Sequence, residues 1–247
     1  MSRLLSSELI KLRTTRTFYA LAGVAIGISL LITVLIASLE EPTKESVLSD
    51  VFQNDSSTLF IMILAIVGIT GEWRHRTITS SLLAAPDRIR FLAAKTLAFA
   101  AAGALLSLAI SISIGIVGYA ILGFRDQPTP VLGDMLELFA RNAGAAALLG
   151  AFGVGVGALI RNQPTAIVAL LVFAFVVDPL LAAFTPDIDR FSPVGALPSA
   201  IQGIDPDDVG SPEVDFFAVV PALALMLVWI SGLFAAGGAL LQARDVE

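Results

Sequence analysis

The sequence predicts an all-α integral membrane protein with six transmembrane helices, and three observations carry this prediction. Of the 247 residues, 56% are hydrophobic and only 15% are charged, whereas a soluble domain carries about 25% charged residues. Mean hydropathy is +0.87. Long uncharged apolar runs recur along the chain, and a helix needs about 20 such residues to cross a bilayer. A soluble enzyme is therefore disfavoured.

We expect one transmembrane domain over residues 1–247, with spans at about 18–39, 53–71, 96–122, 142–160, 164–184 and 216–241. The first run follows basic residues, as in a signal peptide, but its 23 uncharged residues exceed a signal-peptide core. We expect it to remain uncleaved. The second run is short and is predicted to begin near Val51, with Asn54 and Asp55 in the headgroup region. Residues 161–164 indicate either a short loop or one bent helix, and Pro164 favours the loop.

The basic residues are distributed unequally between the two sides of such a six-span protein. The side that holds the N-terminus carries 11 of the 15 Lys and Arg residues, against five acids, and the opposite side carries most of the acids. Cytoplasmic loops are enriched in Lys and Arg. Both termini and residues 72–95 are therefore predicted to be cytoplasmic, in the cytoplasmic membrane.

Residues 1–17 are predicted to form an interfacial helix. Met1, Leu5, Leu9 and Leu12 have the spacing of one apolar helix face, although Glu8 falls beside it. An ordinary basic anchor before the first span remains the alternative.

Residues 72–95 form the longest predicted cytoplasmic loop. A cluster of charged residues opens it, a Thr- and Ser-rich helical run over 77–85 follows, and Pro86 ends that run. Asp87 is a candidate cap for a second helix that leads into the third span. The tip of this helical hairpin is small and apolar, which suits docking into a groove of a cytoplasmic protein. A basic loop that rests on the bilayer without a partner is the alternative.

Asp178 is the one ionisable residue inside the predicted apolar runs. Either it caps or ends the fifth span near the interface, or it belongs to a transport pathway. The following loop, 185–215, carries seven acids and five prolines, and its apolar part is a candidate for dipping back into the bilayer. Gly23/Gly27 and Gly153/Gly157 have the four-residue spacing that lets helices approach closely in lipid.

Several kinds of chemistry are not expected of this chain. It has no cysteine, a single histidine and no phosphate-binding G-x-x-x-x-G-K-[ST] motif. His75 stands alone among arginines, which favours an interface contact over a metal or acid–base role. We expect no catalytic residues, no bound cofactor or metal, and no nucleic-acid partner.

The order of these parts resembles the type-2 exporter permeases of ATP-binding-cassette (ABC) transporters. The resemblance covers the whole chain, from ELIKLRTTRTFYAL before the first span to the acidic loop before the last. Its most specific piece is the pattern G-E-x-R-x-x-T-I-x-x-x-L-L-x-x-P-x-R…A-K over residues 71–95.

The resemblance implies two permease chains, identical or related, paired with two cytoplasmic ATPase subunits that bind ATP and Mg. The loop after the second span would carry the coupling helix, and residues 3–16 would touch the same partner. Glu72 would link helices near an inner gate, and residues 182–204 would hold a re-entrant element. The residues implied in ATPase docking are Arg74, Arg76, Thr77, Ser80, Ser81, Leu82, Leu83, Pro86, Arg88 and Arg90.

The leading hypothesis is therefore the permease subunit of an ATP-driven exporter. The apolar spans suit a drug, peptide or lipid-like cargo better than a small ion. A proton-coupled secondary transporter or channel that uses Asp178 is one alternative, and a non-transporting membrane scaffold is another.

Overall fold

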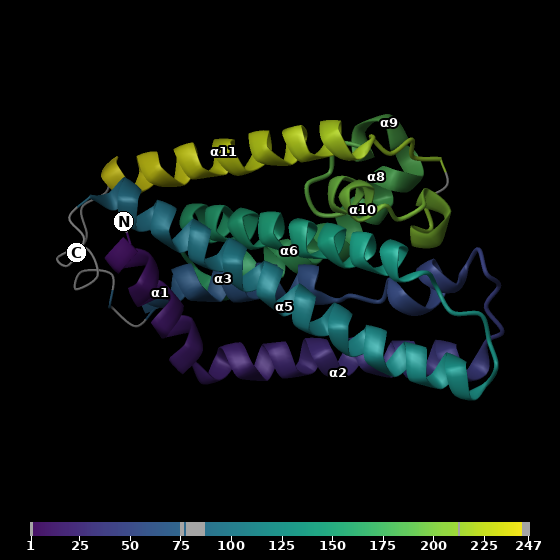
Figure 1. The fold of residues 1–247 in the computed structure, drawn as a ribbon. Helices are drawn as coiled ribbons and strands as arrows, with labels where there is room; N and C mark the ends of the chain where they lie inside the picture. Colours follow the sequence, from purple (N-terminus) through teal and green to yellow (C-terminus); the bar gives the residue numbers. More distant parts are fainter. Residues whose placement is uncertain (1, 75–76, 78–86, 212, 244–247) are drawn as a thin grey trace.

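The computed structural model describes residues 2–74, 77, 87–211 and 213–243, which are mostly helical and contain no strand. Six helical segments in these ranges are long and apolar enough to cross a membrane. They form a bundle in which α3, α5 and α6 lie between α2 and α11 (Figure 1). The six segments are α2 (Arg16–Leu39), Leu48–Arg74, α5 (Arg88–Phe124), α6 (Leu132–Ile160), Gln163–Phe184 and α11 (Val219–Ala243). These segments confirm the predicted class of a helical membrane protein.

The distribution of side chains is that of a bundle surrounded by lipid. Large apolar side chains such as Leu31, Ile116 and Val228 are exposed on α2, α5 and α11, whereas polar Ser29, Thr33 and several other small polar residues are buried. In water such a surface would be unfavourable, but lipid tails are as apolar as these side chains. The exposed faces therefore fit the interior of a bilayer.

Small residues allow α5 and α6 to pack closely. An added Cβ at Gly103 would overlap the carbonyl oxygen of Ala146, and one at Gly150 would overlap the carbonyl oxygen of Phe99. The predicted pair Gly153/Gly157 lies against α3 in the same way, whereas an added Cβ at Gly23 or Gly27 would have no neighbouring atom within 4 Å. Only one of the two glycine pairs therefore belongs to a helix contact in the described residues.

The helices differ from the predicted spans mainly at their ends. A π-helical turn (Leu48–Phe52) precedes α3 (Ser57–Arg74), in the region where the second span was predicted to begin. The third span continues a helix that starts at Arg88, and the fourth lies in a helix that starts at Leu132, ten residues before the predicted boundary. Charged residues such as Asp134 and Arg141 interrupt the apolar run there without interrupting the helix. Hydrogen bonding within a helix continues beyond the apolar part that hydropathy detects.

A short turn separates α6 from α7 (Gln163–Val172) and confirms the predicted break. Arg161 has a positive φ of 51°, which ends α6. The Asn162 side chain then caps α7 by accepting a hydrogen bond from the Thr165 N–H at 3.1 Å, and Pro164 occupies the first turn. The fifth span runs on through a π-helical turn (Phe173–Val177) into α8 (Asp178–Phe184). Because Pro179 has no N–H group to donate, the regular α-helical hydrogen bonding is interrupted there, which explains the π-helical turn just before it.

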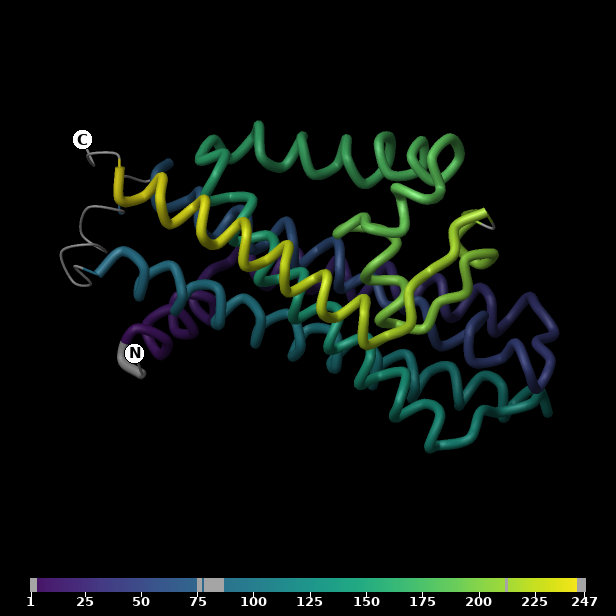
Figure 2. The backbone as a smooth tube through the Cα atoms, turned by 90° about the horizontal axis from the view of Figure 1, so that it is seen from above, coloured from purple at the N-terminus to yellow at the C-terminus, as the bar shows by residue number. Residues whose placement is uncertain are grey.

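The chain between α8 and α11 folds back onto the bundle. It contains α9 (Pro186–Asp189), α10 (Ala196–Gln202) and a 3-10 turn (Pro206–Val209). The apolar side chains of α10 are buried between α6 and α11, and the Gln202 amide donates to Asn142 Oδ1 at 3.2 Å. The candidate re-entrant segment is therefore packed against the spans. Figure 2 shows α7–α8 along one edge of the bundle, with the α9–α10 segment between it and α11.

Helix α1 (Ser2–Thr14) lies at the opposite end of the bundle from α10 (Figure 1). We call these two ends the α1 end and the α10 end. On α1, Leu9 of the predicted apolar face is exposed, whereas Glu8 is buried against the bundle together with the partly buried Leu12. Glu8 turns inward because it meets a buried lysine of α5.

Candidate functional site

A cluster of four charged side chains, three of them buried and one about half exposed, joins α1, α3 and α5 at the α1 end. We call Glu8, Lys11, Glu72 and Lys95 the charge cluster. Lys95 Nζ lies 2.6 Å from Glu8 Oε2 and 3.3 Å from Glu72 Oε1. Lys11 Nζ lies 2.8 Å from Glu8 Oε1 and 2.9 Å from the same Glu72 oxygen. Two carboxylates and two ammonium groups thus compensate one another in a site that water reaches poorly.

Burial makes this cluster more than a surface ion-pair network. The Lys95 side chain is only 2% exposed, and both carboxylates are buried. Lys95 also donates to the carbonyl oxygen of Gly68 at 3.3 Å. Buried charges are tolerated only when they are paired and hydrogen-bonded, so each member depends on the others. Although partial burial lowers the pKa of Lys11, its bonds to Glu8 and Glu72 outweigh this and raise that pKa above its ordinary value of 10.5.

The sequence analysis found Glu72 but missed its partners. Lys95 was counted among the loop charges, and Glu8 was treated as an irregularity in an apolar stripe. The useful signal was that irregularity: an acid on the inward face of an amphipathic helix requires a buried cation. The identity of that cation depends on how α1 packs, which the sequence pattern does not specify.

The charge cluster borders a polar cavity of about 700 Å³. Leu12 and Phe18 line it near the α1–α2 junction, and Gly68 and Phe99 line it from α3 and α5. Charged and apolar groups therefore face the same space. The site offers paired charges and no nucleophile, so it suits binding or conformational coupling rather than covalent chemistry.

The two described ends of the predicted coupling loop are fixed to the bundle. On the α3 side, the Thr77 N–H donates to the Glu72 carbonyl at 2.9 Å, and its hydroxyl lies 3.3 Å from Glu72 Oε2. On the α5 side, Asp87 Oδ1 caps the helix by accepting from the N–H groups of Ile89 and Arg90 at 3.1 and 3.0 Å, which confirms the predicted cap. The loop thus begins at a member of the charge cluster.

The predicted docking arginines that the structure describes differ in their partners. Arg74 donates to Gln163 Oε1 at 3.2 Å, and Arg88 donates to the carbonyl oxygen of Leu241, near the end of α11. Arg90 pairs with Asp87 at 2.9 Å and is well exposed. The remaining residues implied in ATPase docking lie outside the described residues: Arg76, Ser80, Ser81, Leu82, Leu83 and Pro86. His75 lies outside them as well.

Asp178 lies at the α10 end and holds a turn of the following segment. The Ser192 hydroxyl donates to Asp178 Oδ1, and Ser192 Oγ accepts from the N–H groups of Val194 and Gly195, both at 3.3 Å. The neighbouring Asp189 is also buried. Burial and then the nearby Asp178 carboxylate raise the pKa of Asp189 to about 6. These contacts favour the interpretation of Asp178 as an anchor for the α8–α10 segment over a pathway role.

Another buried carboxylate belongs to Asp55, which the sequence predicts to lie in the headgroup region and which the structure packs against α5. Its residue is only 8% exposed. Asp55 Oδ2 accepts from the hydroxyls of Ser107 and Ser111 on α5, and Oδ1 accepts from the Ser57 N–H at 2.8 Å. Two serines four residues apart on one helix face could have signalled a buried acceptor, because hydroxyls inside apolar helices need partners.

The described residues form a helical bundle with six candidate membrane spans, the charge cluster at one end and the α9–α10 segment packed against the spans at the other. No three carboxylate or histidine side chains in the described ranges gather into a group that could hold a metal ion. No family model matches the chain, and no curated protein or solved structure is detectably similar to it.

Proposed function

We propose that the chain is the membrane-spanning permease subunit of an ATP-driven ABC exporter in the cytoplasmic membrane. One observation carries this proposal: both ends of the loop between α3 and α5 are bound into contacts that reach three other helices, α1, α7 and α11. Glu72 connects it to α1 and α5 through the charge cluster, and Arg88 connects it to α11. A displacement applied to this loop would therefore reach most of the bundle, as a coupling element requires.

The distribution of charge supports the orientation that this function needs. Arg13, Arg74, Arg88 and Arg161 all belong to segments at the α1 end, whereas the acidic residues 205–215 belong to the α10 end. Lys and Arg are retained on the cytoplasmic side of membrane proteins. Both termini and residues 72–95 would then face the cytoplasm, where an ATPase is available.

Within this proposal the chain has no nucleotide chemistry of its own. ATP and Mg would be bound by a separate ATPase subunit, present in two copies, and a second permease copy or a paralogue would complete the transporter. Closure of the ATPase pair would move the loop, and the charge cluster would pass that movement to α1, α3 and α5. The cargo would be a drug, a peptide or a lipid-like molecule.

Docking can be tested by placing charge in the loop. We expect the double variant Leu82→Asp/Leu83→Asp to lose co-purification with a candidate ABC ATPase, and to lose the stimulation of ATP turnover by the permease. Val209→Asp is the control for an added acidic side chain, because Val209 is an exposed apolar residue at the α10 end, away from the loop. Unchanged association of the double variant would contradict the docking proposal.

Orientation can be tested separately because the natural chain contains no cysteine. With a membrane-impermeant maleimide and intact cells, Ser81→Cys should stay unlabelled and Val209→Cys should be labelled. Inside-out vesicles should give the opposite result. Labelling of Ser81→Cys in intact cells would rule out a cytoplasmic ATPase as the partner of this loop.

A proton-coupled transporter remains the second candidate, because the partly buried Asp178 lies close enough to the buried Asp189 to raise the pKa of Asp189. It predicts cargo movement by the purified chain alone, driven by a pH gradient and abolished by Asp178→Asn. A non-transporting scaffold predicts partner binding without flux in reconstituted vesicles. Flux that requires the ATPase and ATP would exclude both.

A further inference from the structure

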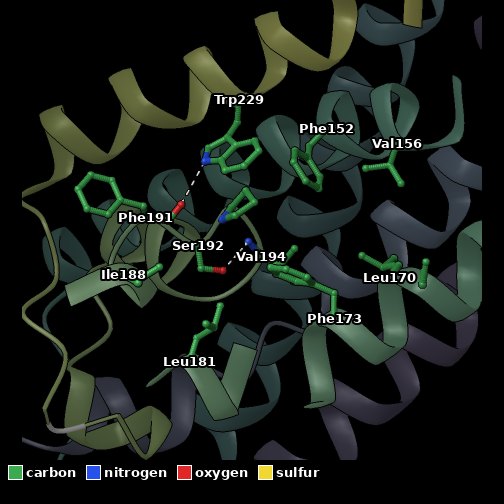
Figure 3. Close-up of a pocket in the computed structure, with 12 residues that line it drawn as sticks. Phe152, Val156, Leu170, Phe173, Leu181, Ile188, Phe191, Ser192, Val194 and Trp229 are labelled. Carbon is green, nitrogen blue, oxygen red and sulfur yellow. Dashed lines mark hydrogen bonds between the residues drawn. The ribbon is translucent and has the colours of Figure 1, made fainter. Parts of the chain in front are cut away.

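A second cavity, at the α10 end, differs in character from the polar cavity. It encloses about 410 Å³ between α6, the α7–α8 segment, α11 and the turn that follows α9. Figure 3 shows Phe152, Leu170, Phe173 and Trp229 around it, from elements far apart in the sequence. Cavities of about 300–1,000 Å³ are the usual size of small-molecule sites. We call it the apolar cavity.

The lining offers no polar group to a ligand. Eleven of the twelve lining residues are apolar, and Ser192 is the exception. The Ser192 hydroxyl already donates to Asp178 and accepts two backbone N–H groups. The indole N–H of Trp229 donates to the carbonyl oxygen of Phe191 at 3.1 Å. Every side-chain donor that reaches this space is therefore already used.

These contacts restrict what can fill the cavity. A buried water needs two to four polar partners, and this lining provides none that is available. An empty space of this size would leave its lining without dispersion contacts. The favourable occupant is therefore an apolar group. The cavity is bordered by three candidate membrane spans, and its rim residues Ile188, Phe191 and Trp229 are exposed, the last at 44%. The molecules that meet such a rim in a bilayer are lipid tails.

We propose that the apolar cavity binds one aliphatic chain of a lipid or lipid-like amphiphile. The chain would enter between Trp229 of α11 and Ile188, and its end would lie near the buried Leu170 and Phe152. Binding itself requires only this chain. The stronger statement, that the exported cargo carries such an aliphatic chain, rests on the proposed export function.

The test uses photo-crosslinking to the purified full-length chain, without an ATPase, in vesicles that contain a phosphatidylcholine with a diazirine on one acyl chain. Peptide mapping should show labelling around Phe173 and Val194 severalfold above that around Leu105 and Ile112, which are exposed on α5. Equal labelling of the two regions would mean that acyl chains contact the cavity no more than they contact the exposed surface of α5, and it would overturn the proposal.

Filling the cavity provides the matched comparison. Ala169→Phe places a ring at an exposed lining position of α7 and should reduce the labelling of Val194 severalfold. Ala109→Phe makes the same change at an exposed position of α5 outside the cavity and should leave it unchanged. Val194→Phe is a second filling variant, read out at Phe173, if Ala169→Phe does not fold. Undiminished labelling in the filled variants would overturn the proposal. Failure of ATPase docking would leave these results unaffected.

Discussion

The two ends of the bundle accommodate buried polar groups in different ways. At the α1 end, two carboxylates and two ammonium groups neutralise one another beside a large polar cavity. At the α10 end, Asp178 is bound by a hydroxyl, its neighbour Asp189 has a raised pKa, and the adjacent cavity is apolar. A balanced charge network depends on all its members, so it connects helices tightly. An apolar space with its polar groups already satisfied suits an apolar ligand. On the proposed function, the α1 end would serve coupling and the α10 end would serve ligand binding.

The largest effect is expected when the balance at the α1 end is broken. Lys95→Met should destabilise the protein by about 3–5 kcal/mol, because removing one partner leaves uncompensated buried charge. Thermal unfolding in detergent measures this. The double variant Lys95→Met/Glu8→Gln restores neutrality and should recover part of the loss. A Lys95→Met protein as stable as the parent would mean that the charge cluster does not hold α1.

A smaller loss is expected at the α10 end. Asp178→Ala removes the acceptor of the Ser192 hydroxyl and should cost about 1–3 kcal/mol, the range for a lost buried hydrogen bond. Asp178→Asn keeps an acceptor oxygen and should cost less. The fluorescence of Trp229, isolated by Trp73→Phe, should report the loosening of the Phe191–Gly195 turn. Equal losses for the two variants would contradict the anchoring role.

The two ends should also respond to different pH ranges. Asp189 has a pKa raised from 3.8 to about 6, so the folded state binds its proton more tightly than the unfolded chain does. Stability should therefore fall as pH rises from about 4 to about 6 and then stay level. Lys11 has a raised pKa, so its contribution should persist below its ordinary pKa of 10.5 and be lost only above it. The melting temperature should depend less on pH between pH 4 and 7 in Asp189→Asn than in the parent protein. Asp187→Asn, at an exposed position, should keep the pH dependence of the parent protein.

The smallest effect is expected for an exposed charge at the same end as the cluster. Arg90→Ala breaks an ion pair with Asp87 in which both side chains are at least half exposed. Its stability should change by less than about 1 kcal/mol. On the proposed function, however, the variant should weaken ATPase association measured by co-purification. A large loss of stability would show that Arg90 supports the fold rather than a partner.

Local signals in the sequence predicted the spans, the Asp87 cap and the break at Asn162. Each depends on residues within a few positions of one another, and the structure has them as expected. The number of candidate membrane spans and their helical structure followed from the length of the apolar runs. Lipid offers no hydrogen-bond partners to the backbone, so such runs must satisfy their backbone groups within a helix.

The contacts that define the two ends depend on packing between distant segments. Glu8 meets Lys95 across 87 positions, and Asp55 meets Ser107 across 52. Asp55 stands at the edge of an apolar run, so hydropathy placed it in the headgroups, although α5 provides hydroxyls for it. The glycine pairs show the same limit: the same spacing lies at a close contact in Gly153/Gly157 and away from one in Gly23/Gly27. Spacing indicates that a face can pack, and only the fold selects which one does.

The turn between α6 and α7 has a mechanical consequence. Arg161 has a positive φ there, its guanidinium stacks on the Trp73 ring at 5.2 Å, and it donates to the carbonyl oxygen of Leu240 at 3.1 Å. These two contacts attach the beginning of the fifth span to α3 and α11. If α7–α8 rotates away from α6, the displacement of its residues would be smallest near Arg161 and would increase toward Phe184. The apolar cavity lies between Arg161 and Phe184 along this span, so a small rotation about Arg161 would change its width.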